Sequence, residues 1–434
     1  MRRGLAPAVF CAFCLFVGTA EGSGAVVKVD FAHPQRAGNA LGFMHGAVAR
    51  LAPTLAARYS ARAEQLRPGV WRGVPRAWSL DLPSVVGSGA RPIIVLSDLW
   101  GLPGHWPTIS PLDDPSRYEA WVHRQARALG AQMPTGLIWV DVWNEPDTGK
   151  FWPVADDPHL HGYMETFLLA ERALRSELGS RVRVIGPSTS KNPSLWTGRL
   201  IGFCARRGCR IDAVAWHVCG GGKKTMGGLA ASLRRARRKA KADRIWHRVL
   251  RPGAQFLIAE YTPPAQRRVP GALLAYWAQI EAGGADNAAL ATWDHGRPQD
   301  GLLDALLDLD GRPRATWWAA RAYAIGRVGR VRTSSSSPEW PALATRRGTD
   351  GLREILLGSW GSSAGRVRVR VAGLPNGRYL MRVGVMYPVG SSWTGTDVRP
   401  IQHRAGAVRV VHGQVTLSIR VPKGAVLSVQ LGSR

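Results

Sequence analysis

The regular alternation of short apolar runs with longer amphipathic stretches constrains the fold of this 434-residue chain more than any other feature. Such alternation is typical of repeated βα units built around a parallel sheet. Eight strand candidates follow one another at residues 41–45, 64–67, 92–97, 136–143, 182–186, 213–218, 254–260 and 287–293. Eight units within about 250 residues or somewhat more predict an α/β fold, the (β/α)8 or TIM barrel.

Amphipathic segments between these strands supply the helices. We expect helices at residues 115–129, 163–178, 226–243 and 271–282, and a last one at 315–325. A doubly wound sheet is the competing arrangement, but it would carry a glycine-rich phosphate turn after an early strand, and none is present. We therefore assign residues 26–332 to the barrel.

The period of the apolar residues changes after a serine-rich segment at 333–338, whose composition is typical of a linker. Residues 367–371, 379–385, 407–411 and 415–421 alternate apolar with polar side chains and are separated by turn residues. This pattern predicts a small antiparallel β-sandwich over residues 339–434. Residues 26–31 alternate in the same way, so they could add a strand to it.

The N-terminus reads as a secretory signal peptide over residues 1–22. Two arginines precede an apolar run from Leu5 to Val17, and small residues follow it. An uncleaved anchor is the alternative and would be the protein's contact with a membrane, but the run is short for a span of roughly 20 residues. We expect a secreted or periplasmic protein.

Three cysteines follow the predicted signal. An oxidising compartment would permit a bridge between Cys204 and Cys209 with Cys219 left over, and three free thiols are the alternative.

The net charge of +28 is large and attracts polyanions. Nine lysines and arginines lie between Arg234 and Arg251, either as a patch for an anionic polysaccharide or as a solvated outer helix face. Nucleic acid is not an expected partner, because no aromatic residues interleave with the charges.

Two carboxylates stand at strand ends. Trp143-Asn144-Glu145-Pro146-Asp147 closes the fourth predicted strand, and Glu260 is the last residue of the seventh. Barrel enzymes place their chemistry at the carboxyl ends of strands, so both acids belong on one rim. Retaining glycosidases need two carboxyl groups about 5–5.5 Å apart, on either side of the scissile bond.

These motifs resemble those of the clan A retaining glycoside hydrolases, and most closely family 39. The Trp-Asn-Glu-Pro-Asp motif, the Ala-Trp-His that ends at His217 and the Asp-Leu-Asp-Gly-Arg-Pro turn before the last helix carry the resemblance. It implies that Glu145 is the acid/base, that Glu260 is the nucleophile and that Asn144 binds a sugar hydroxyl. Cys219 departs from the His-x-Tyr of xylosidase-like members. The family also includes iduronidases and secreted endoglycosidases of exopolysaccharide synthesis.

Further residues are candidates for substrate binding around the rim. Trp293 could form an aromatic floor under the sugar, and His217 ends the sixth strand towards the pocket. The other candidates are His45, Arg67, Trp100 and Tyr261. Asp141 lies four residues before Glu145 and so on the same side of the strand, inside the barrel. A buried acid needs a cation, for which we expect Arg67 at the end of the second strand.

Other chemistries lack their motifs. No His-Glu-x-x-His is present, the cysteine pair lacks the second half of a zinc site, and no nucleophile elbow occurs, so we expect neither metal nor cofactor. The sequence therefore predicts a retaining glycosidase that acts on a cell-surface polysaccharide or exopolysaccharide. The positive charge of the chain would suit a polysaccharide that carries acidic groups. The alternatives are a catalytically silent polysaccharide-binding barrel and an exo-acting, xylosidase-like enzyme.

Overall fold

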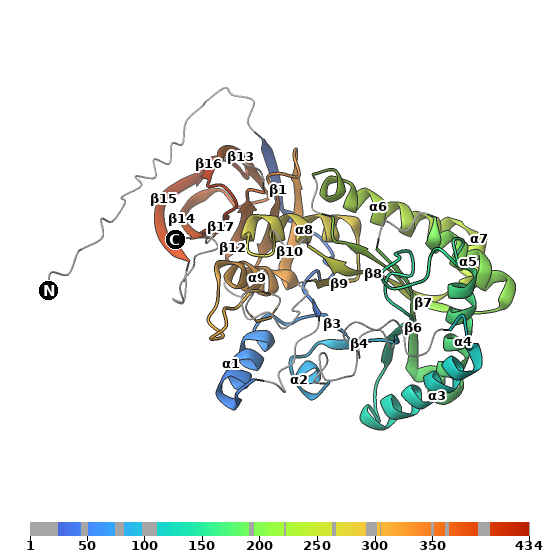
Figure 1. Ribbon diagram of the computed structural model, residues 1–434. Coiled ribbons are helices and arrows are strands. Elements are labelled where there is room, and N and C mark those ends of the chain that lie inside the picture. Colours follow the sequence, from blue (N-terminus) through green and yellow to red (C-terminus); the bar gives the residue numbers. More distant parts are fainter. Residues whose placement is uncertain are drawn as a thin grey trace.

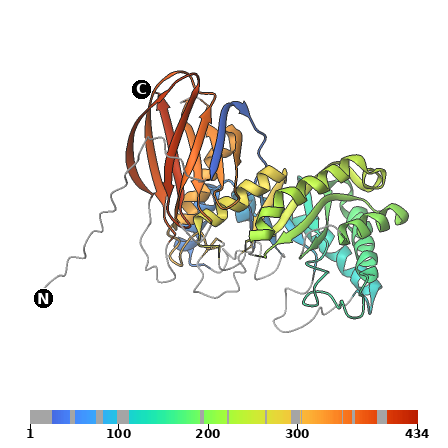
Figure 2. The same cartoon turned by 90° about the horizontal axis from the view of Figure 1, so that it is seen from above.

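The protein consists of a closed barrel and a nine-stranded sheet that lie side by side (Figures 1 and 2). The structure, a computed structural model, describes residues 25–44, 51–73, 82–97, 111–190, 195–220, 223–262, 266–291, 302–303, 305–348, 351–360, 364–388 and 400–433. Within these residues, no helix combines the length and the apolar composition that crossing a bilayer requires. The predicted signal peptide at 1–22 lies outside the described residues.

Eight parallel strands close the barrel in sequence order, which confirms the predicted (β/α)8 architecture. They are β2 (Phe43–Met44), β3 (Val70–Gly73), β4 (Arg91–Val95), β5 (Ile138–Asp141), β6 (Val182–Thr189), β7 (Ile211–Val218), β8 (Leu250–Tyr261) and β9 (Asn287–Leu290). The helices around them are α1 (Pro53–Glu64), α2 (Leu82–Gly87), α3 (Pro115–Gln132), α4 (His161–Leu178), α5 (Trp196–Arg207), α6 (Lys223–Ala242), α7 (Arg244–Val249), α8 (Pro270–Gly283) and α9 (Ala315–Gly326). Short 3-10 turns, η3 (Gly179–Arg181) and η5 (Arg327–Gly329), follow α4 and α9.

Side chains fill the inside of the barrel. Alternate residues of the strands point inward, so that Val70, Ile93, Trp139, Ile185 and Leu257 belong to one buried apolar cluster in the barrel. The barrel interior is therefore a packed core, and any site must lie at one of its two ends.

The second predicted strand, 64–67, is wrong. Those residues end and follow helix α1, which begins at Pro53, and the strand in that position is β3, which is only four residues long. Arg67 therefore precedes its strand and does not end it.

The second domain is a mixed sheet with the order β15-β14-β17-β12-β11-β10-β1-β13-β16. Its strands are β1 (Val26–Pro34), β10 (Arg330–Ser335), β11 (Ala342–Arg346), β12 (Arg353–Gly358), β13 (Gly365–Ala372), β14 (Gly377–Met386), β15 (Ile401–Val410), β16 (Gln414–Val421) and β17 (Val426–Ser433). Alternation places Val367, Val369 and Val371 of β13 in a buried core of its own, as a β-sandwich-like domain requires.

The strand expected at 26–31 does join this sheet as β1, drawn in blue among the orange and red strands (Figure 1). It pairs antiparallel with β10 and parallel with β13. The sheet is therefore mixed, whereas the sequence predicted a purely antiparallel one. The linker predicted at 333–338 is also wrong in its first half, because β10 extends to Ser335 and pairs with β1 along that length.

Two further sequence predictions can be placed on this fold. Cys204 and Cys209 form a disulfide at the end of α5, and Cys219 is free. The basic segment forms α6 and α7, whose inner residues Leu229 and Leu233 are buried and whose charged side chains Arg234, Arg235 and Arg238 are exposed.

Candidate active site

The carboxyl ends of β3, β5, β7 and β8 bring together a group of buried charged side chains at one end of the barrel. Glu260 is the penultimate residue of β8, and its side chain is fully buried. Asn144 and Glu145 follow β5, and His217 lies near the end of β7, opposite Glu260 in the strand pairing. The two carboxylates therefore lie on one rim, as predicted from the sequence.

Arg72 of β3 organises this group. Its Nε donates to Asp141 Oδ2 at 2.8 Å, Nη1 to Glu260 Oε1 at 2.8 Å and Nη2 to Asn144 Oδ1 at 2.9 Å. The side chains of Arg72, Asp141 and Glu260 are all 0% exposed. Each of these charges would be costly to bury alone, and the guanidinium compensates both carboxylates. Its three hydrogen bonds also fix the orientation of Asp141, Glu260 and Asn144.

Asp141 has a second partner, because Ser188 Oγ of β6 donates to its Oδ1 at 2.6 Å. Both carboxylate oxygens of Asp141 are thus satisfied beneath the rim. The role of Asp141 as a buried support agrees with the sequence prediction, but its cation is Arg72 and not Arg67.

The backbone at the rim is held in an uncommon conformation. Trp143 and Glu145 have φ values of 76° and 44°, in the left-handed region. The Trp143 indole is buried and donates to the Phe151 carbonyl, and the Glu145 N–H donates to the Ser188 carbonyl at 3.0 Å. Strained backbone of this kind persists where the surroundings impose it, and it gathers at functional sites. Here it aims the Glu145 side chain across the barrel mouth.

Glu145 and Glu260 face one another across His217. His217 Nδ1 lies 2.8 Å from Glu145 Oε1 and 3.5 Å from Glu260 Oε2. One carboxylate oxygen of each glutamate and one ring nitrogen of His217 all lie within 4.8 Å of one another. The Cys219 thiol lies 3.8 Å from Glu260 Oε2. One oxygen of Glu260 is therefore held by Arg72, and the other faces Glu145, His217 and Cys219.

Burial and neighbouring charges shift the pKa values of the two carboxyl groups in opposite directions. For Glu145, burial acts to raise the pKa, but the hydrogen bond and charge of His217, together with Arg72 and Lys150, bring it below its ordinary value. For Glu260, burial raises the pKa; His217 and Arg72 oppose this rise, and Glu145 adds to it. Burial, with the nearby negative charge of Glu260, also raises the pKa of the Cys219 thiol, which stays protonated at neutral pH.

The same three groups could offer ligands to a metal ion, since Glu145, His217 and Glu260 each present one donor atom. The guanidinium of Arg72 on the second oxygen of Glu260 places a positive charge beside that position, and this charge opposes a cation there. The donor set therefore suits proton transfer better than metal binding.

The structure moves two predicted site residues away from the site. Tyr261 is fully buried, its hydroxyl donates to the Ala40 carbonyl at 2.8 Å, and Trp277 Nε1 donates to that hydroxyl. Neighbouring residues of a strand point to opposite faces, so Tyr261 packs outward when Glu260 points inward. Arg67 precedes β3 and lies at the other end of the barrel. Of the remaining candidates, His45, Trp100 and Trp293 lie outside the described residues.

Two residues that contact the carboxylates were not predicted to do so. Arg72 was missed because Val70-Trp71-Arg72-Gly73 is too short to show alternation, although an arginine directly after an apolar pair could have suggested a buried cation. Cys219 was noted as an unpaired thiol and as the departure from the His-x-Tyr motif, but not as a neighbour of Glu260, although it lies two residues after His217 and hence on the same face of the chain.

The fold has close counterparts among solved structures, whereas no family model matches the sequence. A protein from Neocallimastix frontalis has a TM-score of 0.76 at 17% identity, covering 95% of this chain and 100% of its own. A glycoside hydrolase family 39 enzyme from Xanthomonas axonopodis pv. citri has a TM-score of 0.63 at 16% sequence identity, and the match covers 96% of this chain and 98% of that enzyme. A monomeric β-xylosidase from Caulobacter crescentus has a TM-score of 0.66 at 17% sequence identity, and the match covers 94% of this chain and 99% of that enzyme. The chain thus shares the fold of such glycoside hydrolases along nearly its whole length.

Proposed function

We propose that this protein is a retaining glycoside hydrolase of the clan A type, most similar to family 39. The observation that carries the proposal is the pair of glutamates, one following β5 and the other in β8, with one carboxylate oxygen of each within 4.8 Å of the other. Such a separation suits a retaining enzyme, whereas an inverting enzyme leaves about 6.5–9.5 Å for a water molecule. The likeness in fold to glycoside hydrolases supports the same reaction class.

In the proposed mechanism Glu260 is the nucleophile. Its Oε1 is held by Arg72, so Oε2 is the oxygen available to attack the sugar carbon. Attack forms a glycosyl-enzyme ester and expels the leaving-group oxygen, to which Glu145 gives its proton. Glu145 then takes a proton from a water molecule as the water oxygen attacks the same sugar carbon, which releases the sugar and returns Glu260 to a carboxylate. Asn144, whose Oδ1 accepts from Arg72, has its amide Nδ2 buried without a partner in the described part of the chain, and this group can donate to a sugar hydroxyl.

The pKa directions of the free site bear on these roles. A general acid must start protonated, yet the pKa of Glu145 is lowered through its bond with His217. The side chain of Glu145 is 13% exposed, and that of Glu260 is 0% exposed. A sugar bound over Glu145 would complete its burial, and burial is the influence that raises the pKa of a carboxyl group. We therefore assign the protonated state of Glu145 to the substrate complex and not to the free protein.

We further propose a secreted or periplasmic location and a polysaccharide substrate, with acidic groups favoured. The predicted signal peptide and the disulfide between Cys204 and Cys209 support an oxidising compartment. The net charge of +28 and the exposed arginines of α6 support an anionic polymer. Binding of such a polymer should weaken as salt is raised, and a salt-independent affinity would contradict this part of the proposal.

Mechanism-based labelling tests the central proposal. A panel of 2-fluoro glycosides with activated leaving groups should trap an ester, and peptide mapping by mass spectrometry should place it on Glu260. Glu260→Gln should abolish both labelling and turnover. Glu145→Gln should retain cleavage of activated aryl glycosides while losing about 10²–10⁴-fold on unactivated ones, because the former need little protonation.

A matched control is Glu177→Gln, which removes a carboxylate bonded to His123 and Arg127 on the outer helices and should leave turnover unchanged. An ester on Glu145 would reverse the two roles. If no panel sugar labels the protein and none is hydrolysed, while polysaccharide still binds, the barrel is a silent binding protein.

A further inference from the structure

A cavity of about 610 Å³ lies at the end of the barrel opposite the two glutamates. The first residues of β4 and β9, Arg91 and Asn287, line it together with Gly69, which precedes β3. The packed apolar core of the barrel separates this cavity from the carboxylate rim. Substrate bound at the rim would not reach it.

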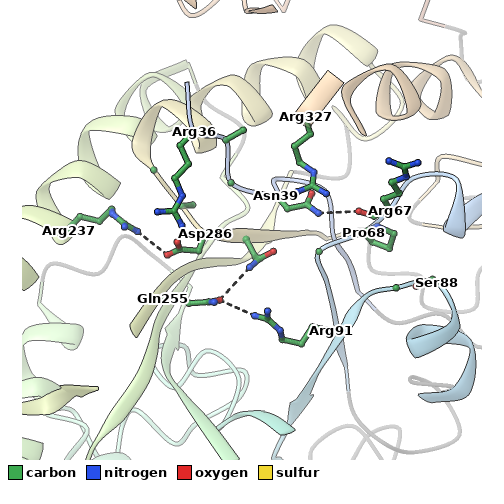
Figure 3. A pocket seen from close by; sticks show the side chains of 17 residues that line it. Arg36, Asn39, Arg67, Pro68, Ser88, Arg91, Arg237, Gln255, Asp286 and Arg327 are labelled. Carbon is green, nitrogen blue, oxygen red and sulfur yellow. Dashed lines mark hydrogen bonds and ion pairs between the residues drawn. The ribbon is translucent and has the colours of Figure 1, made fainter. Parts of the chain in front are cut away.

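Arginine dominates the wall of this cavity, and we call the cavity the basic pocket (Figure 3). Of the described residues that line it, five are arginines and one, Asp286, is an acid. The arginines come from separate parts of the chain and are Arg36, Arg67, Arg91, Arg237 and Arg327. Like charges that line one cavity repel one another, and a bound anion would offset this repulsion.

The single carboxylate is already engaged. Asp286 Oδ2 accepts from Arg237 Nη1 at 2.9 Å and from the Phe256 N–H at 2.8 Å. Asp286 therefore compensates Arg237 and fixes the wall, and it leaves the other four guanidinium groups without an acidic partner at the pocket.

Those four groups have neutral partners or none. Arg91 donates to Gln255 at 3.2 Å and lies over the Trp139 ring, and burial lowers its pKa. For Arg36, Arg67 and Arg327, no carboxylate in the described residues lies within ion-pair distance. Arg36 and Arg67 are exposed, and Arg327 is half-buried, so a ligand can reach all three.

The remaining wall indicates the class of ligand. Among the described residues, the rest of the lining is made of glycines, of Ala37, Pro68 and Ala285, and of the polar side chains Asn39, Asn287, Gln255 and Ser88, none of them aromatic. A sugar ring or a nucleobase would have no platform on which to stack. Guanidinium groups instead match the paired oxygens of phosphate-type anions, to which each can donate two hydrogen bonds.

We propose that the basic pocket binds a compact multivalent oxyanion of the phosphate class, with pyrophosphate as its simplest representative. Arg36 lies on the segment that leads from β1 into the barrel, and Arg327 lies on η5, which leads from α9 back to the sheet. The chain passes between the two domains at these two segments. An anion bound to both Arg36 and Arg327 would link the segments and stabilise the junction of the domains. This site is independent of the glycosidase activity.

Calorimetric titration of the full chain with pyrophosphate at about 0.15 M salt tests the proposal, since that ionic strength screens non-specific attraction. We expect saturable one-to-one binding and a higher Tm with ligand. The double variant Arg36→Gln/Arg327→Gln should bind at least about tenfold more weakly, because two charge-assisted contacts are lost. Its own fold should be unaffected, since neither side chain has an acidic partner in the described chain.

Arg409→Gln is the matched control, because it removes one positive charge from an exposed position on β15. It should bind pyrophosphate as the wild type does. Orthophosphate should bind more weakly than pyrophosphate, and chloride at equal ionic strength should not raise the Tm. Absence of saturable binding would overturn the proposal, as would equal affinity in the double variant or an equal effect of all anions.

Discussion

At the scale of single residues, Glu260 illustrates a conflict between reactivity and stability. The residue is fully buried, and its raised pKa means that the folded protein binds its proton more tightly than the unfolded chain does. The cost of ionising Glu260 is therefore largest at neutral pH and disappears as the pH falls towards its ordinary value of 4.5.

We accordingly expect Glu260→Gln to have a higher Tm than the wild type at pH 7, with the difference shrinking as the pH falls towards about 4.5. Arg72 keeps Asp141 as its counterion in this variant, so the guanidinium is not left uncompensated. Thermal unfolding of both proteins from pH 4.5 to 8 measures the effect. A difference that is constant across this range would show that ionisation of Glu260 is not its cause.

The residues of the site show how far sequence reasoning reaches. Glu145 and Glu260 could be predicted because each stands at the end of a recognisable apolar run in the sequence, although β5 itself ends at Asp141, four residues before Glu145. Tyr261 was assigned to the rim although strand alternation, applied to its neighbour Glu260, points it outward. The apolar pair before Arg72 could have suggested a buried cation, but its role could not be predicted, because its three partners are residues 69, 72 and 188 positions away along the chain.

At the scale of elements, β1 is the strand whose place matters most. It lies inside the sheet between β10 and β13, and Val27, Val29 and Phe31 enter the core of the second domain. A strand in the interior of a sheet contributes hydrogen bonds on both edges and one buried face. Loss of β1 packing should therefore weaken the whole domain.

Phe31→Ala should lower the free energy of unfolding by about 3–5 kcal/mol, because it removes a buried aromatic ring and leaves a cavity. Lys28→Ala, on the exposed face of the same strand, should change it by less than about 0.5 kcal/mol. Denaturant unfolding of both variants checks the comparison. Equal effects would mean that the β1 face does not pack as described.

Element lengths explain which elements could be predicted. The expected helices at 115–129, 163–178 and 271–282 lie within α3, α4 and α8. Helices α3 and α4 show several turns of amphipathic pattern, whereas α8 is apolar and buried on nearly all sides, so its length marks it as a helix. Short strands carry too few residues for a period to show. The second strand was therefore predicted at residues 64–67, at the end of α1, and not at β3. The serine-rich end of β10 resembled a linker because its order comes from pairing with β1, not from apolar residues.

At the scale of the whole molecule, barrel and sheet are joined by a buried junction. Arg330 of β10 donates two hydrogen bonds of 3.0 Å to Glu281 of α8, and a third at 2.9 Å to Thr345 of β11. Gly271, at the start of α8, donates its N–H to the Gly424 carbonyl in the sheet domain at 2.9 Å. Backbone therefore meets backbone across the junction.

Gly271→Ala should destabilise the protein by at least about 1–3 kcal/mol, since a Cβ there would lie 2.0 Å from the Ser359 carbonyl oxygen. Gly228→Ala is the matched control, because it lies in α6 with no atom within 4 Å of the added Cβ. It should stabilise the protein by about 0.5–1 kcal/mol. Calorimetry of both variants tests the junction, and a neutral Gly271→Ala would contradict the close backbone contact.

The position of β1 has a consequence for the order in which the protein matures during synthesis. Domains generally fold as they leave the ribosome, beginning from the N-terminus. Strand β1 pairs with β13, which is synthesised more than 300 residues later. The barrel can form while the chain is still growing, but β1 must wait with both edges unsatisfied, so a nascent chain truncated before β13 carries an open strand that invites pairing with other chains.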